Sequence, residues 1–566
     1  MTEEISNQYH KVAIDGVPKL RQQGESMMKT NERDRRRASR YLQSAAAATA
    51  IGFAASPAAA LTCSQVASSF HRPNTTITTA QTVPAGTFVA PTVPPQSIMG
   101  LPQFCRVAGF TTPTSDSHIN FEVWVPESGW NQKYLQVGCG GFCGSIPYTS
   151  MAEPLRRGYA AAATDGGHQA SDSTDASWAV GHPEKVVDVG YRSLKETTDV
   201  AKDIIMAFES SGPRRSYFMG CSDGGREALM EAQRYPRDFD GIVAGSPANY
   251  VTHLLTGDVW NQKALAAISS GDLSQADLNV VSNAMLAQCA GHDGGLSSDQ
   301  FLNDPPACRF NPEKLALPRD KVEAVKKIFS GPPGIFPGYR VGGDEASNPA
   351  NWPAWLTDSG NPANATQALF GDNYFKDIVF PNSGWTPDTF SIAENALQAD
   401  VRTGAILNSV DPDLRPFQSH GGRLIQYVGW GDTAISPEND INYYNAVTRE
   451  IGGHEDIREF YRLFMVPGMA HCGGGPGPNA FGQGVNGPNP SDAADDILTA
   501  LDQWVENRNA PDNIVATKYV NDDPTQGIAF QRPLCPFPQL AKYKGTGSTT
   551  SAASFACVKS DHDESR

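Results

Sequence analysis

Two cysteines stand directly beside two residues that could carry catalysis. Cys221 precedes Ser222, and Cys472 follows His471 far along the chain. Bonded cysteines have Cα atoms about 4.4–6.8 Å apart. A disulfide between these two would therefore bring the hydroxyl and the imidazole close to hydrogen-bonding range. The pattern predicts a nucleophile, a base and an oxidising compartment together.

Size and charge narrow the class of protein. The 566 residues indicate two to four domains, or one large domain with insertions. Hydrophobic residues make up 40% of the chain and charged residues 19%, as in soluble globular proteins. The formal net charge of −16 argues against nucleic acid and anionic membrane surfaces as partners. None of these quantities predicts an oligomeric state.

Residues 1–60 have the pattern of a signal or targeting segment. A group of arginines between positions 33 and 40 precedes an alanine-rich run, Leu42–Ala60, which ends in an A-x-A-like cleavage site. A single membrane anchor is the alternative. After Ala60 no stretch approaches the ~18 apolar residues that a membrane span needs. We therefore expect no stable membrane insertion and a periplasmic or secreted protein.

The chain contains ten cysteines, an even number. After an export signal, this favours disulfides over free thiols or a zinc site. Counting alone cannot assign the pairs. Local spacing suggests four short links and one long link: Cys63–Cys105, Cys139–Cys143, Cys289–Cys308, Cys535–Cys557 and Cys221–Cys472. The chain-entropy model gives the long link about 5 kcal/mol of stabilisation.

Strands and helices alternate between residues 120 and 245. The pattern predicts strands at 120–125, 133–137, 158–164, 216–219 and 241–245, and helices at 191–211 and 227–235. Such alternation is typical of an α/β fold with a parallel, doubly wound sheet.

The alternation stops between about Asn249 and His420 and resumes with an apolar strand pattern at 423–430. A stretch of this length is domain-sized and far longer than an ordinary connection. We therefore expect a lid domain at 249–420, inserted into a catalytic domain formed by 61–248 and 421–566.

The segment Gly220–Gly224 fits the G-x-S-x-G nucleophile elbow around Ser222, with a strand pattern before it and a helix pattern after it. Asp432 follows the resumed strand pattern and His471 comes later, which gives the order Ser, Asp, His of α/β-hydrolases. Asp440 is the nearest rival for the acid. We expect Ser222 to attack an acyl carbon, His471 to transfer the proton, and Asp432 to fix the imidazole tautomer.

An oxyanion hole needs backbone N–H donors. The elbow predicts one donor from Asp223, the residue after the nucleophile, and one from the glycine-rich loop 138–144, which follows an early strand pattern. A plain tight turn is the alternative for that loop.

Four stretches are similar to a known family: Tyr217–Glu227, Phe239–Pro247, Val466–Cys472 and Arg532–Gly545. The chain resembles the tannase and feruloyl esterase family, which includes mono(2-hydroxyethyl) terephthalate hydrolase, from about Cys63 to Cys557. The resemblance implies an α/β-hydrolase core with a large lid after the strand at 241–245. It also implies a disulfide between the cysteines beside the serine and the histidine. The activity it implies is hydrolysis of small aromatic acid esters, without an organic cofactor.

Carried over by position, the resemblance places the triad on Ser222, Asp432 and His471. It places the second oxyanion donor on Gly141 and an aromatic substrate contact on Trp355.

Two departures bear on the substrate. A phenylalanine near the catalytic acid of the terephthalate hydrolase becomes Ile435 here, and residues 356–400 contain no arginine to hold a free carboxylate, although Lys376 could substitute. We therefore place phenolic acid esters first and the terephthalate half-ester second. Two other classes stay open. One is a non-catalytic hydrolase relative that binds aromatic glycans, and the other is a peptidase. The intact Ser–His–Asp set argues against the non-catalytic relative.

The resemblance also implies a structural calcium ion in the lid, bound by the loop 289–301. The ligands would be the carboxylates of Asp293 and Asp299 and the carbonyls of Gly295 and Phe301. Ala290 stands where the family has its first aspartate. The alternative is a glycine-rich loop held by a disulfide.

Overall fold

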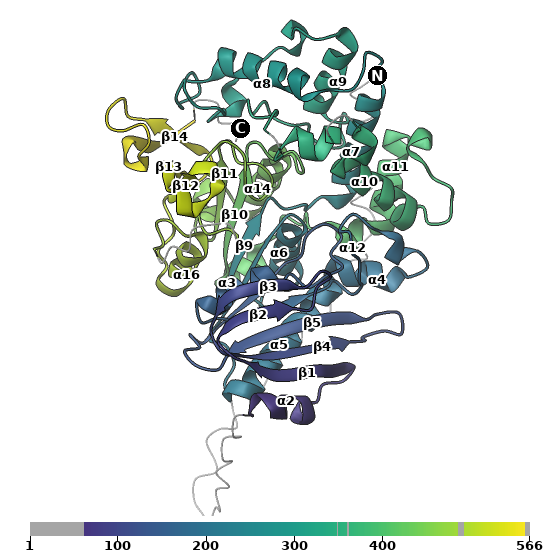
Figure 1. Ribbon diagram of the computed structural model, residues 1–566, viewed down its shortest axis with the longest axis vertical. Helices are drawn as coiled ribbons and strands as arrows, with labels where there is room; N and C mark the ends of the chain where they lie inside the picture. Colours follow the sequence, from purple (N-terminus) through teal and green to yellow (C-terminus); the bar gives the residue numbers. More distant parts are fainter. Residues whose placement is uncertain (1–60, 348, 359–360, 485–491, 561–566) are drawn as a thin grey trace, which may run out of the picture. The chain divides into compact units, whose positions relative to one another are not determined.

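The computed structural model describes residues 61–347, 349–358, 361–484 and 492–560 (Figure 1). The predicted targeting segment at 1–60 lies outside the described residues. Within the described ranges, no helix combines the length and the apolar character that crossing a membrane requires.

A nine-stranded mixed sheet forms the centre of the described chain. Its strands lie in the order β1-β4-β5-β7-β6-β8-β9-β10-β11. Six neighbours in that order are parallel: β7 (Ala160–Thr164), β6 (Lys133–Val137), β8 (Arg215–Cys221), β9 (Gly241–Gly245), β10 (Arg423–Gly429) and β11 (Tyr461–Val466). The predicted α/β class and the predicted strands are confirmed.

Three antiparallel strands extend the sheet beyond β7: β5 (Ile119–Pro126), β4 (Phe104–Thr111) and β1 (Thr75–Val83). The prediction of a parallel sheet was therefore incomplete. The edge strand β1 consists mainly of threonines, and its burial alternates only weakly. An edge strand of this kind lacks the apolar alternation by which a sequence predicts strands.

Helices cover both faces of the sheet, as a doubly wound fold requires. In β10, Leu424 and Val428 pack in one core cluster, whereas Ile425 and Tyr427 pack in another. The first cluster includes side chains of α5 (Ser193–Glu209), α6 (Asp223–Arg234) and α14 (Pro437–Ile451). The second includes side chains of α3 (Tyr148–Arg156) and α16 (Ile497–Asn507). Successive side chains of a strand point to opposite faces, so both faces of β10 are buried.

Shorter elements surround this core. They are α2 (Cys63–Ser69), β2 (Gly86–Ala90), β3 (Gln96–Leu101), α4 (Pro183–Val187), α15 (His454–Ile457), β12 (Ile514–Tyr519), β13 (Ile528–Leu534), β14 (Gln539–Tyr543) and β15 (Phe555–Lys559). The last four form two antiparallel pairs, β12–β13 and β14–β15.

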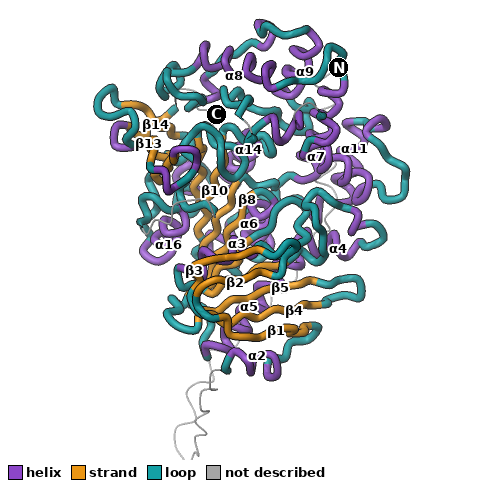
Figure 2. Tube along the Cα trace, in the orientation of Figure 1, coloured by secondary structure: helices purple, strands orange, loops and turns teal. Residues whose placement is uncertain are grey.

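The segment between β9 and β10 is helical, with no strand in its described residues (Figure 2). Its α-helices are α7 (Val251–Ala266), α8 (Gln275–Cys289), α9 (Arg319–Ser330), α10 (Thr366–Asn373), α11 (Ile392–Ala399), α12 (Ala405–Leu407) and α13 (Arg415–His420). The helix α7 packs on α9, α10 and α11. Side chains of α7 also share an apolar cluster with Phe142, Trp178 and Val189, which precede β9 in the chain. The domain limits at 249 and 420 stay predictions.

All five predicted disulfides are present. The pairs are Cys63–Cys105, Cys139–Cys143, Cys221–Cys472, Cys289–Cys308 and Cys535–Cys557. They leave no cysteine unpaired in the described chain.

Candidate active site

Ser222 lies in a sharp turn between β8 and α6. Its φ of 66° and ψ of −124° fall in a region that non-glycine residues rarely adopt. Gly220 and Gly224 let the turn close, because a Cβ on Gly220 would lie 2.5 Å from the carbonyl oxygen of Gly224. The helix α6 begins immediately after the serine, four residues earlier than the sequence predicted. The positive end of its dipole therefore lies at Ser222.

Asp432 and His471 are in direct contact. His471 Nδ1 lies 2.9 Å from Asp432 Oδ2. The other carboxylate oxygen accepts the N–H groups of Ala434 and Ile435 at 3.0 and 2.9 Å. Because the carboxylate can only accept, Nδ1 is the donor, and Nε2 is left to accept a proton.

Backbone hydrogen bonds tie the loop of the acid to the loop of the histidine. Gly431 N–H donates to Met469 O at 3.0 Å, and Trp430 N–H donates to Val466 O at 2.9 Å. A Cβ on Gly429 would lie 2.1 Å from the same Met469 oxygen. The glycine is therefore required for the two loops to approach this closely.

The Cys221–Cys472 disulfide joins the neighbours of Ser222 and His471, with Cα atoms 6.0 Å apart. The side chains of Ser222 and His471 line one cavity. No hydrogen bond links the serine hydroxyl to the imidazole within the described residues. Such bonds are often long in substrate-free enzymes and shorten only when substrate binds.

Two residues that line the same cavity have backbone N–H groups without an acceptor in the described chain. These residues are Gly141 and Asp223. The loop of Gly141 is held in place, since Phe142 N–H donates to Ser173 O at 2.8 Å and Gly224 N–H donates to Cys139 O at 2.8 Å. The predicted oxyanion donors are thus placed beside Ser222 without a protein partner.

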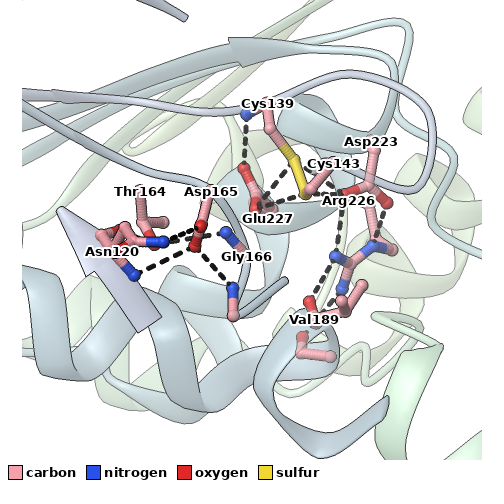
Figure 3. The surroundings of a disulfide bond; sticks show 12 residues. Asn120, Cys139, Cys143, Thr164, Asp165, Gly166, Val189, Asp223, Arg226 and Glu227 are labelled. Carbon is pink, nitrogen blue, oxygen red and sulfur yellow. Dashed lines mark hydrogen bonds and ion pairs between the residues drawn. A yellow bond between two sulfur atoms is a disulfide. The ribbon is translucent and has the colours of Figure 1, made fainter. Parts of the chain in front are cut away.

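A buried cluster of charges supports this loop, and the sequence did not predict it (Figure 3). Arg226 Nη2 donates to Asp223 Oδ2 at 2.9 Å, and the guanidinium also donates to the carbonyls of Val189 and Gly190. Glu227 Oε2 accepts the N–H of Cys139 at 2.9 Å, directly beneath the Cys139–Cys143 disulfide.

Two carboxyls of this region hold their protons unusually firmly. Burial, reinforced by the charge of Asp223, raises the pKa of Glu227 to about 8. Burial raises the pKa of Asp165 to about 7, although Asn120 and Gly167 donate hydrogen bonds to it. Both groups lie beside the loop 138–144, which carries Cys139 and Cys143 (Figure 3).

The cavity beside Ser222 has a volume of about 430 Å³, within the usual range for small-molecule sites. Apolar side chains make most of its wall, among them Phe142, Trp178, Leu254 and Phe370. The two residues predicted to contact substrate also line it. Trp355 comes from η5 (Pro353–Thr357), in the segment between β9 and β10, and Ile435 lies three residues after Asp432.

A second cavity, of about 620 Å³, also borders the Cys221–Cys472 disulfide. The two cavities share Gly140, His471 and both cysteines. Polar side chains of Asn479, Gln483 and Asp522 line the second one. His471 and the disulfide therefore border both an apolar space and a more polar one, whereas Ser222 borders the apolar space.

The sequence model of one family, described as tannase and feruloyl esterase, matches residues 105–558. The chain belongs to this family. It is a carboxylic ester hydrolase, and the predicted resemblance is confirmed.

Individual relatives and solved structures support the same family. An uncharacterized esterase of Xanthomonas campestris pv. campestris is 40% identical over 86% of this chain and 90% of its own. A probable feruloyl esterase B-2 of Aspergillus terreus is 29% identical over 88% of this chain and 95% of its own. The crystal structure of feruloyl esterase B from Aspergillus oryzae superposes with a TM-score of 0.79, at 28% identity over 88% of this chain and 99% of that one. Tannin acyl hydrolase from Aspergillus niger shares the fold, with a TM-score of 0.67 and 20% identity over 89% and 95% of the two chains.

The loop 289–301, in the segment between β9 and β10, offers few ligands to calcium. Asp299 Oδ1 lies 3.2 Å from Arg532 Nη2, and Asp299 Oδ2 accepts the N–H of Leu296. Asp293 accepts the N–H groups of Gly295 and Asn303. Calcium takes six to eight oxygen ligands. In this loop the two carboxylates already accept from hydrogen-bond donors, and one of these donors is the cationic Arg532.

Phe301, the remaining predicted ligand, lies in the same loop with its ring buried against Gly468 of the histidine loop. The loop therefore does not fit a calcium site of the usual kind, and the calcium prediction is not confirmed. Among the described residues, one other group of possible ligands lies close together, namely Cys139, Cys143, Asp223 and Glu227. Its cysteines are joined in a disulfide and cannot supply thiolate ligands.

Proposed function

We propose that this family member is an exported serine esterase that hydrolyses esters of aromatic, chiefly phenolic, acids through an acyl-enzyme. The observation that carries the proposal is the meeting of three features at one cavity. These are a serine on a strained elbow, an imidazole oriented by a buried carboxylate, and an apolar wall with aromatic side chains.

In the first half of the reaction, Ser222 Oγ bonds to the acyl carbon while its proton moves to His471 Nε2. The carbonyl oxygen becomes an oxyanion, which the N–H groups of Asp223 and Gly141 receive. Collapse of this intermediate breaks the bond to the alcohol oxygen, which leaves with the proton of His471. Asp432 keeps the imidazole in the tautomer that can accept and then return this proton.

In the second half, water replaces the alcohol. Its oxygen bonds to the acyl carbon as its proton moves to His471, and the oxyanion forms again in the same place. Collapse now breaks the bond to Ser222, which recovers the proton, and the free acid leaves. The net reaction consumes one water and yields one acid and one alcohol.

The apolar cavity suits the acyl group, and the more polar cavity, which shares His471 and the disulfide with it, suits the alcohol. The only arginine lining the apolar cavity, among the described residues, is Arg226, and it is already paired with Asp223. Lys376, the substitute considered for a carboxylate contact, is not among the lining residues and lies 3.3 Å from Asp377. These contacts favour phenolic acids over the terephthalate half-ester, which would bring a free carboxylate.

Five disulfides support the proposal of export, since such bonds persist in oxidising compartments. The relatives named as feruloyl esterases support the choice of acyl group.

Turnover of methyl gallate, methyl ferulate and mono(2-hydroxyethyl) terephthalate by the purified protein tests the proposal. We expect hydrolysis of one or both phenolic esters at a kcat/KM at least tenfold above that of the terephthalate half-ester. A fluorophosphonate probe should label the wild-type protein and leave Ser222→Ala unlabelled. Labelling that survives in Ser222→Ala would disprove the serine mechanism, and a preference for the terephthalate ester would disprove the substrate class. Absence of both labelling and turnover would favour the non-catalytic binding class.

A further inference from the structure

One wall of the apolar cavity carries a carboxyl group that the reaction does not use. Val251, Leu254, Leu255 and Asp258 of α7 all line the cavity. Their spacing of three, four and seven residues places them on one face of the helix. The side chain of Asp258 therefore faces the same space as the three apolar ones.

Asp258 lacks the partners that a buried acid normally has. Only 4% of the residue is exposed, and its Oδ1 has no hydrogen-bond partner in the described chain. Burial raises the pKa of Asp258 well above its usual range. An unpartnered buried polar group is costly to the fold, so the absence of a partner points to a ligand that supplies one.

The polar side chains around Asp258 are occupied with one another. Gln367 accepts from Asn261 Nδ2 at 3.0 Å and donates to the Tyr339 hydroxyl and to Thr433 O. None of these bonds reaches Asp258. Asn261 Oδ1 also lacks a partner, but Asn261 does not line the cavity. Among the described residues that line the cavity, Asp258 is therefore the one whose buried side chain has an unpartnered polar atom.

The position of Asp258 suits the far end of an acyl group. Ala248, just before α7, donates its N–H to the carbonyl oxygen of Ser222 at 3.1 Å. A helix rises 1.5 Å per residue, so Asp258 lies about 10 Å further along the axis of α7 than Val251. Between the two ends, Leu254 and Leu255 provide an apolar wall for a ring.

We propose that Asp258 binds a hydroxyl group on the aromatic ring of the acyl moiety and thereby selects esters of ring-hydroxylated acids. This inference rests on the proposed function and names the residue that would bind the phenolic hydroxyl. A protonated carboxyl both donates and accepts a hydrogen bond, which matches a phenolic hydroxyl. An acyl group without that hydroxyl leaves the carboxyl unpartnered, and a site built for a hydroxyl discriminates strongly against such an analogue.

Methyl 4-hydroxycinnamate and methyl cinnamate differ only in the ring hydroxyl and provide the test. For the wild-type enzyme we expect a kcat/KM ratio of at least tenfold in favour of the hydroxylated ester. In Asp258→Ala the ratio should fall to about one, mainly through loss on the hydroxylated ester. Asp258→Asn keeps a donor and an acceptor and should retain an intermediate ratio. Asp272→Asn, which removes an exposed acid of the same insertion, should leave the ratio unchanged.

Stability distinguishes this role from a structural one. Removing an unpartnered buried polar group does not break a contact, so we expect the melting temperature of Asp258→Ala to stay equal to that of the wild type or to rise. A ratio near one in the wild-type enzyme would overturn the inference, whether or not any variant folds. A ratio that stays high in Asp258→Ala would also overturn it.

Failure of the proposed function gives a different result. If the wild type hydrolyses neither ester, binding of 4-hydroxycinnamic acid and cinnamic acid to the protein is compared by thermal shift. Tighter binding of the hydroxylated acid that is lost in Asp258→Ala would uphold the role of Asp258 and disprove the esterase specificity. Equal binding of the two acids, or none, would overturn both.

Discussion

The Trp355 ring and the imidazole of His471 pack in a T-shaped arrangement, with ring centroids 5.0 Å apart and planes at 82°. A residue of the insertion thus touches the proposed general base. The same indole lines the acyl cavity. Substrate contact and orientation of the imidazole therefore meet in one side chain.

Replacing Trp355 by alanine should lower kcat/KM for methyl ferulate about tenfold or more, because an edge-to-face aromatic pair contributes about 0.5–1.5 kcal/mol beyond its buried area. Trp355→Phe should retain most activity. Steady-state kinetics on purified variants measure the effect. The matched control is Trp260→Ala, since that indole lies outside the cavity and donates to Lys327 O. Equal losses in Trp355→Ala and Trp260→Ala would contradict the assigned role.

Asp432→Asn should reduce kcat by about 10³–10⁴-fold with little change in melting temperature. The amide would present its NH₂ group either to His471 or to the N–H groups of Ala434 and Ile435, and the first arrangement favours the wrong imidazole tautomer. Asp440→Asn tests the rival acid. Asp440 is buried and hydrogen-bonded to Gln426, away from the histidine, so its variant should keep kcat within about threefold. The reverse ranking of the two variants would refute the triad.

The double variant Cys221→Ala/Cys472→Ala should lose both stability and turnover. The matched control is Cys63→Ala/Cys105→Ala, which removes a disulfide far from the serine. In the chain-entropy model each link stabilises the fold by about 4–5 kcal/mol, so both variants should melt earlier. Only the first should lose kcat when each is assayed well below its own melting temperature. Undiminished turnover in the first variant would show that the tether does not position the hydroxyl and the imidazole.

Stability should fall as the pH rises from about 5 to 8. The folded protein keeps the proton of Glu227 to a pKa of about 8, whereas the ordinary value is 4.5. In that interval the folded state holds a proton that the unfolded state has released, so rising pH favours unfolding. One such group contributes at most about 1.4 kcal/mol per pH unit.

Melting temperatures measured across this pH range test the assignment. Glu227→Gln should flatten the decline, because the glutamine oxygen can still accept the N–H of Cys139. Glu394→Gln, which changes an exposed acid of the insertion, should reproduce the wild-type slope. An unaltered slope in Glu227→Gln would exclude this carboxyl as the cause.

Chelation should leave the protein unchanged. Because Arg532 and backbone N–H groups already bind the carboxylates of the loop 289–301, we expect EDTA to shift the melting temperature by less than about 1 °C. A bound structural calcium would stabilise the folded state, so its removal would lower the melting temperature by mass action. If EDTA lowers the melting temperature and added calcium reverses the change, the protein does bind structural calcium and the present interpretation is wrong.

The proposed catalytic residues were predictable because their signals are local. The glycines around Ser222 are dictated by a turn in which a single Cβ would collide with backbone, and the order of serine, acid and histidine follows the order of the strands. Paired cysteines beside the serine and the histidine added a distance restraint that no single motif carries. Structure confirms that pairing and the contact between Asp432 and His471.

Other features depend on contacts between distant segments, and the sequence could not supply them. Asp258 lies in α7, most of whose residues are buried, and an aspartate by itself predicts a solvated position rather than the wall of a cavity. Glu227 follows the elbow like any helical acid, and its role emerges only where the loop of Cys139 folds over it. The sequence did not predict the edge strand β1, because its threonines give no alternation of apolar and polar residues.

The strands β9 and β10 are hydrogen-bonded neighbours, with Gly245 beside Tyr427. The whole helical segment that supplies Trp355 and Asp258 thus leaves β9 at its C-terminal end and returns at the N-terminal end of the adjacent, parallel β10, where Arg423 pairs with Gly241. Recombination at those two points could graft a foreign helical segment while the serine, histidine and acid stay on their own loops. Acyl preference could then diversify by wholesale exchange of a module, with Ser222 and its partners inherited unchanged.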